Sequence, residues 1–84
     1  MCNDADEELF LSRLGMAVKK AREDLNLSQR QFADACSIHR TYLLRAEKGR
    51  NVGILYLKRI CETAGISLPQ LLAFHKAPPK QKKR

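Results

Sequence analysis

Residues 27–49, LSQRQFADACSIHRTYLLRAEKG, decide how this chain folds. Ser28 is followed three residues later by Gln31. This capping-box pattern marks the start of a helix, because each side chain can bond the backbone N–H of the other residue. It predicts a short helix over residues 29–36 that is interrupted at Ser37. The inward-facing residues of this helix are Phe32, Ala33 and Cys36.

A second helix is predicted over residues 40–48, and the glycine at position 49 is a residue type that commonly ends a helix. The apolar residues at helical spacing are Ile38, Tyr42, Leu43 and Ala46. The residues left facing outward are His39, Arg40, Thr41, Leu44 and Arg45. This spacing alone does not distinguish a solvated basic face from a face that binds a partner.

The packing code of the two helices is more specific. Helices that cross at a tight turn need a small residue where they touch, and Ala33, the fifth residue from Gln29, supplies it. Apolar residues are also needed at the fourth, eighth, tenth, fifteenth and eighteenth places of this count. The residues at these places are Phe32, Cys36, Ile38, Leu43 and Ala46. The stretch is therefore predicted to form a helix-turn-helix.

Three further helices complete an all-α, five-helix domain over residues 9–75. The first has apolar residues at steps of three and four, and Asn26 is its predicted stop; these residues are Leu11, Leu14, Val18, Ala21 and Leu25. The fourth helix covers residues 54–64 and closes at a glycine, and the last covers Leu68–Phe74. The acidic residues 1–8 and the basic tail, residues 76–84, are predicted to be disordered.

The charge distribution favours an acidic partner. The 84 residues carry a net charge of +7, and residues 9–75 hold eleven basic against five acidic residues. A basic body with a basic tail is typical of nucleic-acid binding, while charge that only maintains solubility is the alternative. No apolar run reaches the ~18 residues that span a membrane, and the acidic start does not resemble a signal peptide.

The sequence does not indicate an enzyme, a cofactor, a metal site or a small-molecule ligand. It contains no nucleophile–base arrangement and no glycine loop of the kind that cradles phosphate. Cys36 and Cys61 fall in apolar patterns and are interpreted as buried thiols, whereas Cys2 is interpreted as an exposed terminal thiol. Neither histidine lies at ligand spacing to a cysteine. These features fit a reducing cytoplasm.

Residues 27–49, together with ILYLKRICETAGISLPQLL (54–72), resemble the Cro/C1-type (XRE) helix-turn-helix family. Within that family, the RTY of residues 40–42 and the RN of residues 50–51 look most similar to the controller proteins of restriction–modification systems. The resemblance implies a compact domain of lambda-repressor-like type. Two residues depart from the family pattern: Ser37 replaces the usual turn glycine, and His39 replaces the usual serine or threonine cap.

The resemblance implies that the second helix of the motif lies in the major groove of DNA. The expected base-reading residues are Arg40, Thr41, Leu44, Arg45 and His39. The expected contacts to the DNA backbone are Gln29, Tyr42, Arg50, Asn51, Arg30 and Lys48. For Tyr42 a pure core role is the alternative. The resemblance also implies an ion pair between Arg22 and Glu47 that fixes the reading helix to the first helix.

A homodimer is expected, because one reading helix contacts only a few base pairs and apolar residues exceed what a single core needs. The expected interface residues are Ile54, Leu55, Tyr56, Leu68, Leu71, Leu72 and Phe74. The alternative is that the last helix only caps the core of the monomer.

These observations predict a cytoplasmic, nucleoid-associated transcriptional regulator that binds double-stranded DNA at a pseudo-palindromic operator. A restriction–modification controller comes first, ahead of a phage-type repressor or an antitoxin-type repressor. RNA polymerase is a further candidate partner, and no membrane association is expected. The alternative from another class is a protein- or RNA-binding helical adaptor that binds through the basic tail.

Overall fold

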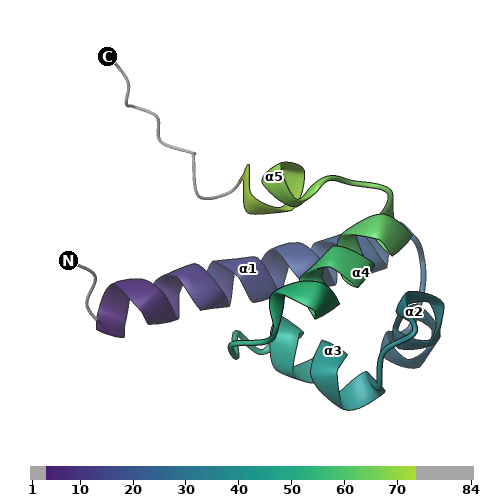
Figure 1. Cartoon of the computed structure of the whole chain (residues 1–84), viewed down its shortest axis with the longest axis horizontal. Helices are drawn as coiled ribbons and strands as arrows, with labels where there is room; N and C mark the ends of the chain where they lie inside the picture. Colours follow the sequence, from purple (N-terminus) through teal and green to yellow (C-terminus); the bar gives the residue numbers. More distant parts are fainter. Residues whose placement is uncertain (1–3, 74–84) are drawn as a thin grey trace.

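The computed structural model describes residues 4–73, and every regular element in this range is a helix. The five helices are α1 (Asp4–Asp24), α2 (Gln29–Cys36), α3 (Arg40–Glu47), α4 (Ile54–Ala64) and α5 (Leu68–Leu71). Helices α2 and α3 lie at one end of the molecule and α5 at the other, with α1 and α4 between them (Figure 1). The all-α, five-helix prediction is therefore confirmed.

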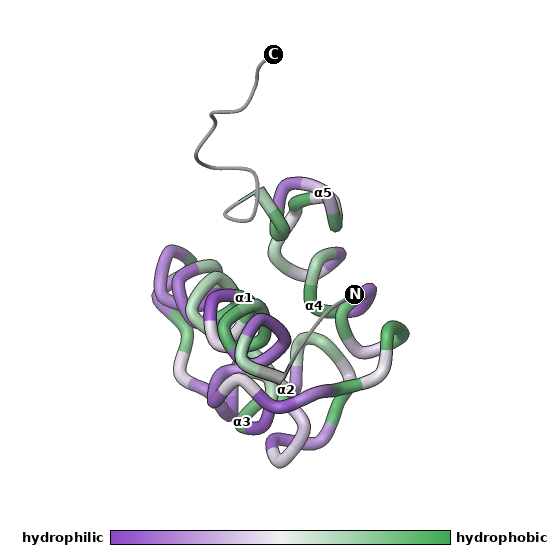
Figure 2. Tube along the Cα trace, turned by 90° about the vertical axis from the view of Figure 1, so that its left-hand side faces the viewer, coloured by the Kyte–Doolittle hydropathy of each residue, from purple (hydrophilic) through white to green (hydrophobic). Residues whose placement is uncertain are grey.

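Helix α1 begins earlier than the sequence predicted. Residues 1–8 were expected to be disordered, but the helix starts at Asp4. Of these eight residues, the first three lie outside the described range. The physical reason is electrostatic: Asp6 and Glu7 fall in the first turn, where the positive end of the helix dipole favours negative side chains. Hydrophilic and hydrophobic segments alternate along α1, as an amphipathic helix requires (Figure 2).

The end of α1 corrects a second prediction. Leu25 was expected in the buried stripe, but the helix ends at Asp24 and the Leu25 side chain is 42% exposed. Asn26, the predicted stop, has a φ of 60°, so the backbone turns away before the stripe can continue. Val18 and Leu14, about two and three turns earlier in the helix, are buried as predicted.

The core contains residues of all five helices and of the turn between α2 and α3. Its largest fully buried side chains are Phe32, Leu43, Ile60 and Val18. The six positions of the packing code are all buried, which confirms the prediction for this motif; they are Phe32, Ala33, Cys36, Ile38, Leu43 and Ala46. Cys36 and Cys61 are also buried, and removal from water raises the pKa of both thiols.

The turn between α2 and α3 uses a residue with a Cβ in a left-handed conformation. Ser37 has φ 59° and ψ 40°, and its N–H closes the end of α2 on the carbonyls of Ala33 and Asp34. The Nη1 of Arg59, on α4, donates to the Ser37 carbonyl at 3.0 Å. The turn thus adopts the geometry expected of a glycine, with a contact from α4 supporting it.

Helix α5 is shorter than predicted. The expected helix ran from Leu68 to Phe74, whereas the observed one ends at Leu71 and Leu72 has cap geometry, with φ −88° and ψ 6°. Its start is as predicted, because Ser67 and Gln70 form a capping box with a proline in the first turn. Phe74 lies outside the described residues.

Candidate nucleic-acid interface

The outer side of α3 and the loop after it form one open surface. Arg40, Thr41 and Arg45 are exposed along the helix, and Leu44 is half-buried between them. A hollow of about 620 Å³ lies across this surface, lined by Thr41, Leu44, Arg45, Lys48, Arg50 and Asn51. The structure therefore brings together side chains that the sequence assigned separately to base reading and to backbone contact.

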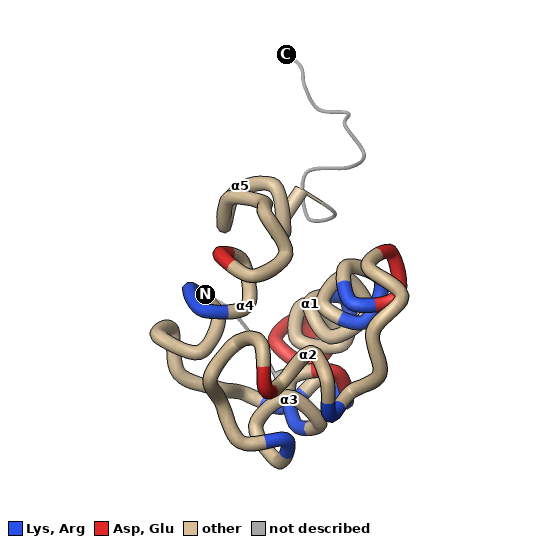
Figure 3. Tube along the Cα trace, turned by 90° about the vertical axis from the view of Figure 1, so that its right-hand side faces the viewer, with Lys and Arg blue, Asp and Glu red and all other residues tan. Residues whose placement is uncertain are grey.

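The cations on this surface have no partner within residues 4–73. No hydrogen bond or ion pair in that range involves the side chains of Arg40, Arg45, Lys48 or Arg50. Four cations elsewhere are engaged within the chain, namely Lys20, Arg22, Lys58 and Arg59. Figure 3 shows lysine and arginine positions around α3, and others on α1 and α4. Unpaired cations on an open face are available to an external anion such as a DNA phosphate.

His39 begins the reading helix. It is the N-cap residue of α3, and its Nδ1 accepts a hydrogen bond from the Thr41 N–H at 3.1 Å. The sequence had marked His39 as a departure from the usual serine or threonine cap, yet the imidazole nitrogen satisfies one of the free N–H groups at the helix start. The ring is exposed, so capping and contact with DNA are compatible.

The inner side of α3 carries the ion pair that the resemblance implied. Arg22 Nε donates to Glu47 Oε2 at 2.7 Å, and Nη2 donates to Oε1 at 3.3 Å. The side chains are 11% and 4% exposed. The Arg22 Nη1 also donates to the Leu27 carbonyl at 2.9 Å. Hydrogen bonding to Glu47 raises the pKa of Arg22. The pair is confirmed, and it joins α1, the α1–α2 turn and α3.

Gln29 takes part in the same network. Its Nε2 donates to Glu47 Oε1 at 3.0 Å, a contact that the sequence did not predict. An amide nitrogen has two N–H groups, so this bond leaves one for the phosphate contact that was expected. Arg30, the next residue, is exposed. Gln29 thus links the start of α2 to the end of α3 across the motif.

Tyr42 turns its ring towards α4. It stacks on Tyr56, with ring centroids 4.3 Å apart and planes at 17°. Both residues are half-buried. Tyr42 was expected to contact the DNA backbone or fill the core, and Tyr56 was expected at the dimer interface. In this chain the two rings pack on each other.

The residues expected at the dimer interface have different environments. Ile54 and Leu55 are 62% and 67% exposed at the start of α4. Leu68 and Leu72 are half-buried against the core. Leu71 is only 3% exposed and belongs to the core, because the single turn of α5 directs it inward. The assignment of Leu71 to an interface is therefore corrected.

Gly15 is a residue that sequence reasoning missed. It lies on α1 against the end of α3, where an added Cβ would be 2.5 Å from the Ala46 carbonyl oxygen. The same atom would be 2.7 Å from the Glu47 oxygen and 2.9 Å from the Gly49 nitrogen. All three neighbours are backbone atoms, so α3 can approach α1 this closely only with glycine at the site.

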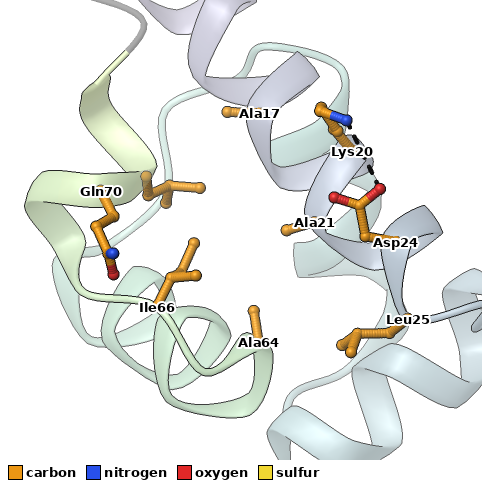
Figure 4. Close-up of a pocket in the computed structure, with 9 residues that line it drawn as sticks. Ala17, Lys20, Ala21, Asp24, Leu25, Ala64, Ile66 and Gln70 are labelled. Carbon is orange, nitrogen blue, oxygen red and sulfur yellow. Dashed lines mark ion pairs between the residues drawn. The ribbon is translucent and has the colours of Figure 1, made fainter.

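A second hollow, of about 330 Å³, lies between α1 and the α4–α5 segment (Figure 4). Its lining is mostly apolar, and the Lys20–Asp24 ion pair, at 3.6 Å, borders it. Among residues 4–73, no group of three or more histidine, cysteine or acidic side chains is placed to hold a metal ion. No helix in that range has the length and apolar character to cross a membrane.

The sequence model of the helix-turn-helix family matches residues 18–71, a range that includes all of α2, α3 and α4. The chain belongs to this family. Control protein C.MunI from Mycoplasma sp is 40% identical over 63 residues, which cover 73% of this chain and 85% of that protein. Control protein C.BamHI from Bacillus amyloliquefaciens is 36% identical over 62 residues, covering 71% and 76%.

The fold is also similar to a solved controller structure. The restriction–modification controller protein C.AhdI from Aeromonas hydrophila matches with a TM-score of 0.67 and 27% identity, over 74% of this chain and 94% of that chain. The resemblance to the Cro/C1-type family and to its controller proteins is therefore confirmed. The chain is a helix-turn-helix DNA-binding regulator, and its named relatives are control proteins rather than enzymes.

Proposed function

We propose that the chain is a restriction–modification controller that binds a pseudo-palindromic operator as a homodimer and regulates transcription. The observation that carries this proposal is the open surface of α3, where four cations without partners in residues 4–73 surround or adjoin one hollow. Sequence similarity to two control proteins supports the same assignment. Such a regulator acts on the nucleoid in the cytoplasm.

Base reading falls to the N-terminal half of α3. Arg40 is the first residue of the helix and is exposed, so its guanidinium can form two hydrogen bonds to the O6 and N7 of a guanine. Thr41 offers a hydroxyl to a base edge and a methyl group to thymine. Leu44 and Arg45 lie one turn further along the same face. Leu44 offers apolar contact to thymine methyls.

Contacts to the DNA backbone then fix the position of the helix. Lys48, Arg50 and Asn51 border the hollow from the end of α3 and the following loop. The second N–H of Gln29 adds a contact at the start of α2, where the helix dipole also favours an anion. Several such contacts imply that affinity falls steeply with salt concentration.

Dimerisation uses the apolar edge at the start of α4. Ile54 and Leu55 are both more than half exposed, which is costly for a monomer in water. Burying them against a second copy, with Leu68 and Leu72 extending the edge, places two reading helices about one DNA turn apart (~34 Å). Light scattering at micromolar concentration tests this step, and a monomer there contradicts it.

The test of the proposed function is selection of bound sequences from a random pool of DNA duplexes at stated salt. We expect an enriched, two-fold symmetric sequence. Arg40→Ala should lower the preference for that duplex over a scrambled one by a free energy of about 1–3 kcal/mol. Lys20→Ala, which removes one positive charge beside the second hollow, is the control and should keep the preference.

Deletion of residues 76–84 separates this proposal from an adaptor that binds through its basic tail. Sequence-specific duplex binding should survive the deletion, because α3 is the proposed reader. Loss of all specific binding in the shortened chain, with Arg40→Ala having no effect in the full chain, contradicts the proposal.

A further inference from the structure

Helix α3 is held unequally on its different sides. It packs chiefly against α1 and α2, while its contact with α4 is slight. The stacked rings of Tyr42 and Tyr56 join α3 directly to α4. Buried residues of both helices also belong to the common core, so the ring stack adds a specific contact at the start of α3.

The stack lies beside the proposed reading residues. Tyr42 is the third residue of α3 and directly follows Arg40 and Thr41. Tyr56 is the third residue of α4 and directly follows the exposed Ile54 and Leu55. The neighbouring Tyr42 side chain raises the pKa of Tyr56, as expected for two side chains that lie together in a ring stack. The two stacked residues are thus adjacent in sequence to the proposed base-reading residues of α3 and to the exposed apolar residues of α4.

The Tyr56 ring lies near Gly53, the cap residue of α4 at the end of the loop that follows α3. A Cβ built on Gly53 would lie 3.6 Å from Cδ2 of Tyr56, which places the ring at ordinary packing distance from that loop position. The loop carries Arg50 and Asn51, two of the residues bordering the hollow. The Tyr56 ring therefore lies beside the end of this loop and does not line the hollow itself.

We propose that Tyr56 is a positioning residue for DNA reading, which acts by holding Tyr42 and thereby fixing the start of α3 relative to α4 and its preceding loop. This inference rests on the proposed function, because it assigns a role in binding an operator. Tyr56 contacts no base in this account. It lowers the cost of binding by keeping Arg40 and Thr41 in one orientation before DNA arrives.

The test is a double-mutant cycle on DNA discrimination with Tyr42→Leu, Tyr56→Leu and the double variant. The probes are the duplex recovered by selection and a scrambled duplex of equal length. We expect Tyr56→Leu to reduce the ratio of specific to non-specific affinity about three- to tenfold, the range that an aromatic pair supports. Because Tyr56 acts through Tyr42, the double variant should discriminate no worse than Tyr42→Leu alone.

Tyr56→Phe is the matched control, since it keeps the ring and removes only the hydroxyl. It should retain discrimination within about twofold, because the ring stack carries most of the contact. Thermal unfolding of each variant checks that the fold is kept. Equal discrimination in Tyr56→Leu and the parent chain overturns the inference, and so do effects of the two leucine substitutions that simply multiply.

Tyrosine absorbance provides a readout that does not require DNA. The chain contains two tyrosines and no tryptophan, so its alkaline titration reports only Tyr42 and Tyr56. We expect a tyrosine with a raised pKa in the parent chain and its return to the ordinary pKa in Tyr42→Leu. A Tyr56 titration in Tyr42→Leu that equals its titration in the parent chain contradicts the coupling of the two side chains. Failure to select any duplex, with the titration as expected, overturns the proposed function first and the positioning role with it.

Discussion

On the inner side of α3, the Glu47 carboxylate accepts hydrogen bonds from Arg22 and Gln29, whereas on its outer side Arg40 and Arg45 have no partner within residues 4–73. The same helix therefore carries charge in two environments. The inner charges are nearly excluded from water and are paired. The outer charges are solvated and unpaired. The inner set fixes the helix in place, and the outer set is free for DNA.

The difference predicts which property each substitution changes. Removing one partner of a buried pair leaves the other charge uncompensated, so the free energy of unfolding falls. Removing an exposed, unpaired charge leaves the fold almost unaffected but removes a contact to a ligand. The four substitutions below test this separation, starting with the largest expected effect.

Glu47→Ala should have the largest effect on stability. It removes the acceptor of Arg22 and of Gln29 and leaves a guanidinium that is 11% exposed without its partner. We expect the free energy of unfolding in urea to fall by about 3–5 kcal/mol. Glu62→Ala, which breaks the exposed pair with Lys58, is the control and should cost less than about 1 kcal/mol. Similar losses in both variants contradict the assignment.

Gly15→Ala tests the close approach of α1 to the inner side of α3. The added methyl group would meet three backbone atoms at 2.5–2.9 Å, and α3 must shift to accept it. We expect a loss of about 1–3 kcal/mol in the free energy of unfolding, together with weaker specific DNA binding. Gly65→Ala is the comparison, because its methyl group has no atom within 4 Å and causes no crowding. Any loss of stability in that variant comes from the backbone strain of alanine at a φ of 76°. A stable Gly15→Ala chain with full DNA binding would refute this account of the contact.

Arg40→Ala should show the opposite pattern. The side chain is exposed and has no partner within the described residues, so the free energy of unfolding should change by less than about 0.5 kcal/mol. Its loss should appear as reduced discrimination between the selected and the scrambled duplex. Parallel urea titrations and binding assays measure both quantities. If Arg40→Ala lowers the free energy of unfolding but leaves discrimination between the two duplexes unchanged, the outer side of α3 stabilises the fold instead of binding DNA, which contradicts the proposal.

The main effect expected of His39→Ala is smaller than the losses of stability or of DNA discrimination expected of the other three variants. It removes the Nδ1 that accepts from the Thr41 N–H and so leaves that helix start uncapped, at a cost of about 1 kcal/mol. His39→Ser restores a capping oxygen and should recover most of this loss. Circular dichroism during thermal unfolding measures the difference. If serine restores stability but not DNA affinity, the imidazole also contacts DNA.

Much of the fold could be predicted because its signals are local. The capping box of Ser28 and Gln31 and the small Ala33 are present where the sequence placed them. The errors also have local causes. The burial of Leu25 was predicted from its spacing, but the helix ends at Asp24 and the chain turns at Leu25 and Asn26. The early start of α1 was missed because apolar periodicity does not extend to it. Acidic residues at the helix start stabilise it instead.

The polar contacts of the candidate site were harder to predict, because they join distant residues. Arg22 and Glu47 were paired through a family resemblance, and the spacing of residues alone does not pair them. No pattern indicated that Gln29 would donate to Glu47 or that Tyr56 would stack on Tyr42. Gly15 gave no signal either, because a glycine within a helix marks a close contact only once the second helix is in place.

The sequence by itself determined the helices α2, α3 and α4 and the buried positions of the helix-turn-helix. In α4 it did not determine that Ile54 is exposed. Helical periodicity and capping depend on residues within about four positions of each other, and this information is complete in the chain. Only the tertiary structure decided which charges of α3 are neutralised internally and which remain free. Pairing depends on what neighbouring helices bring within hydrogen-bond distance, and α1 brings Arg22 to Glu47 while nothing in residues 4–73 reaches Arg40.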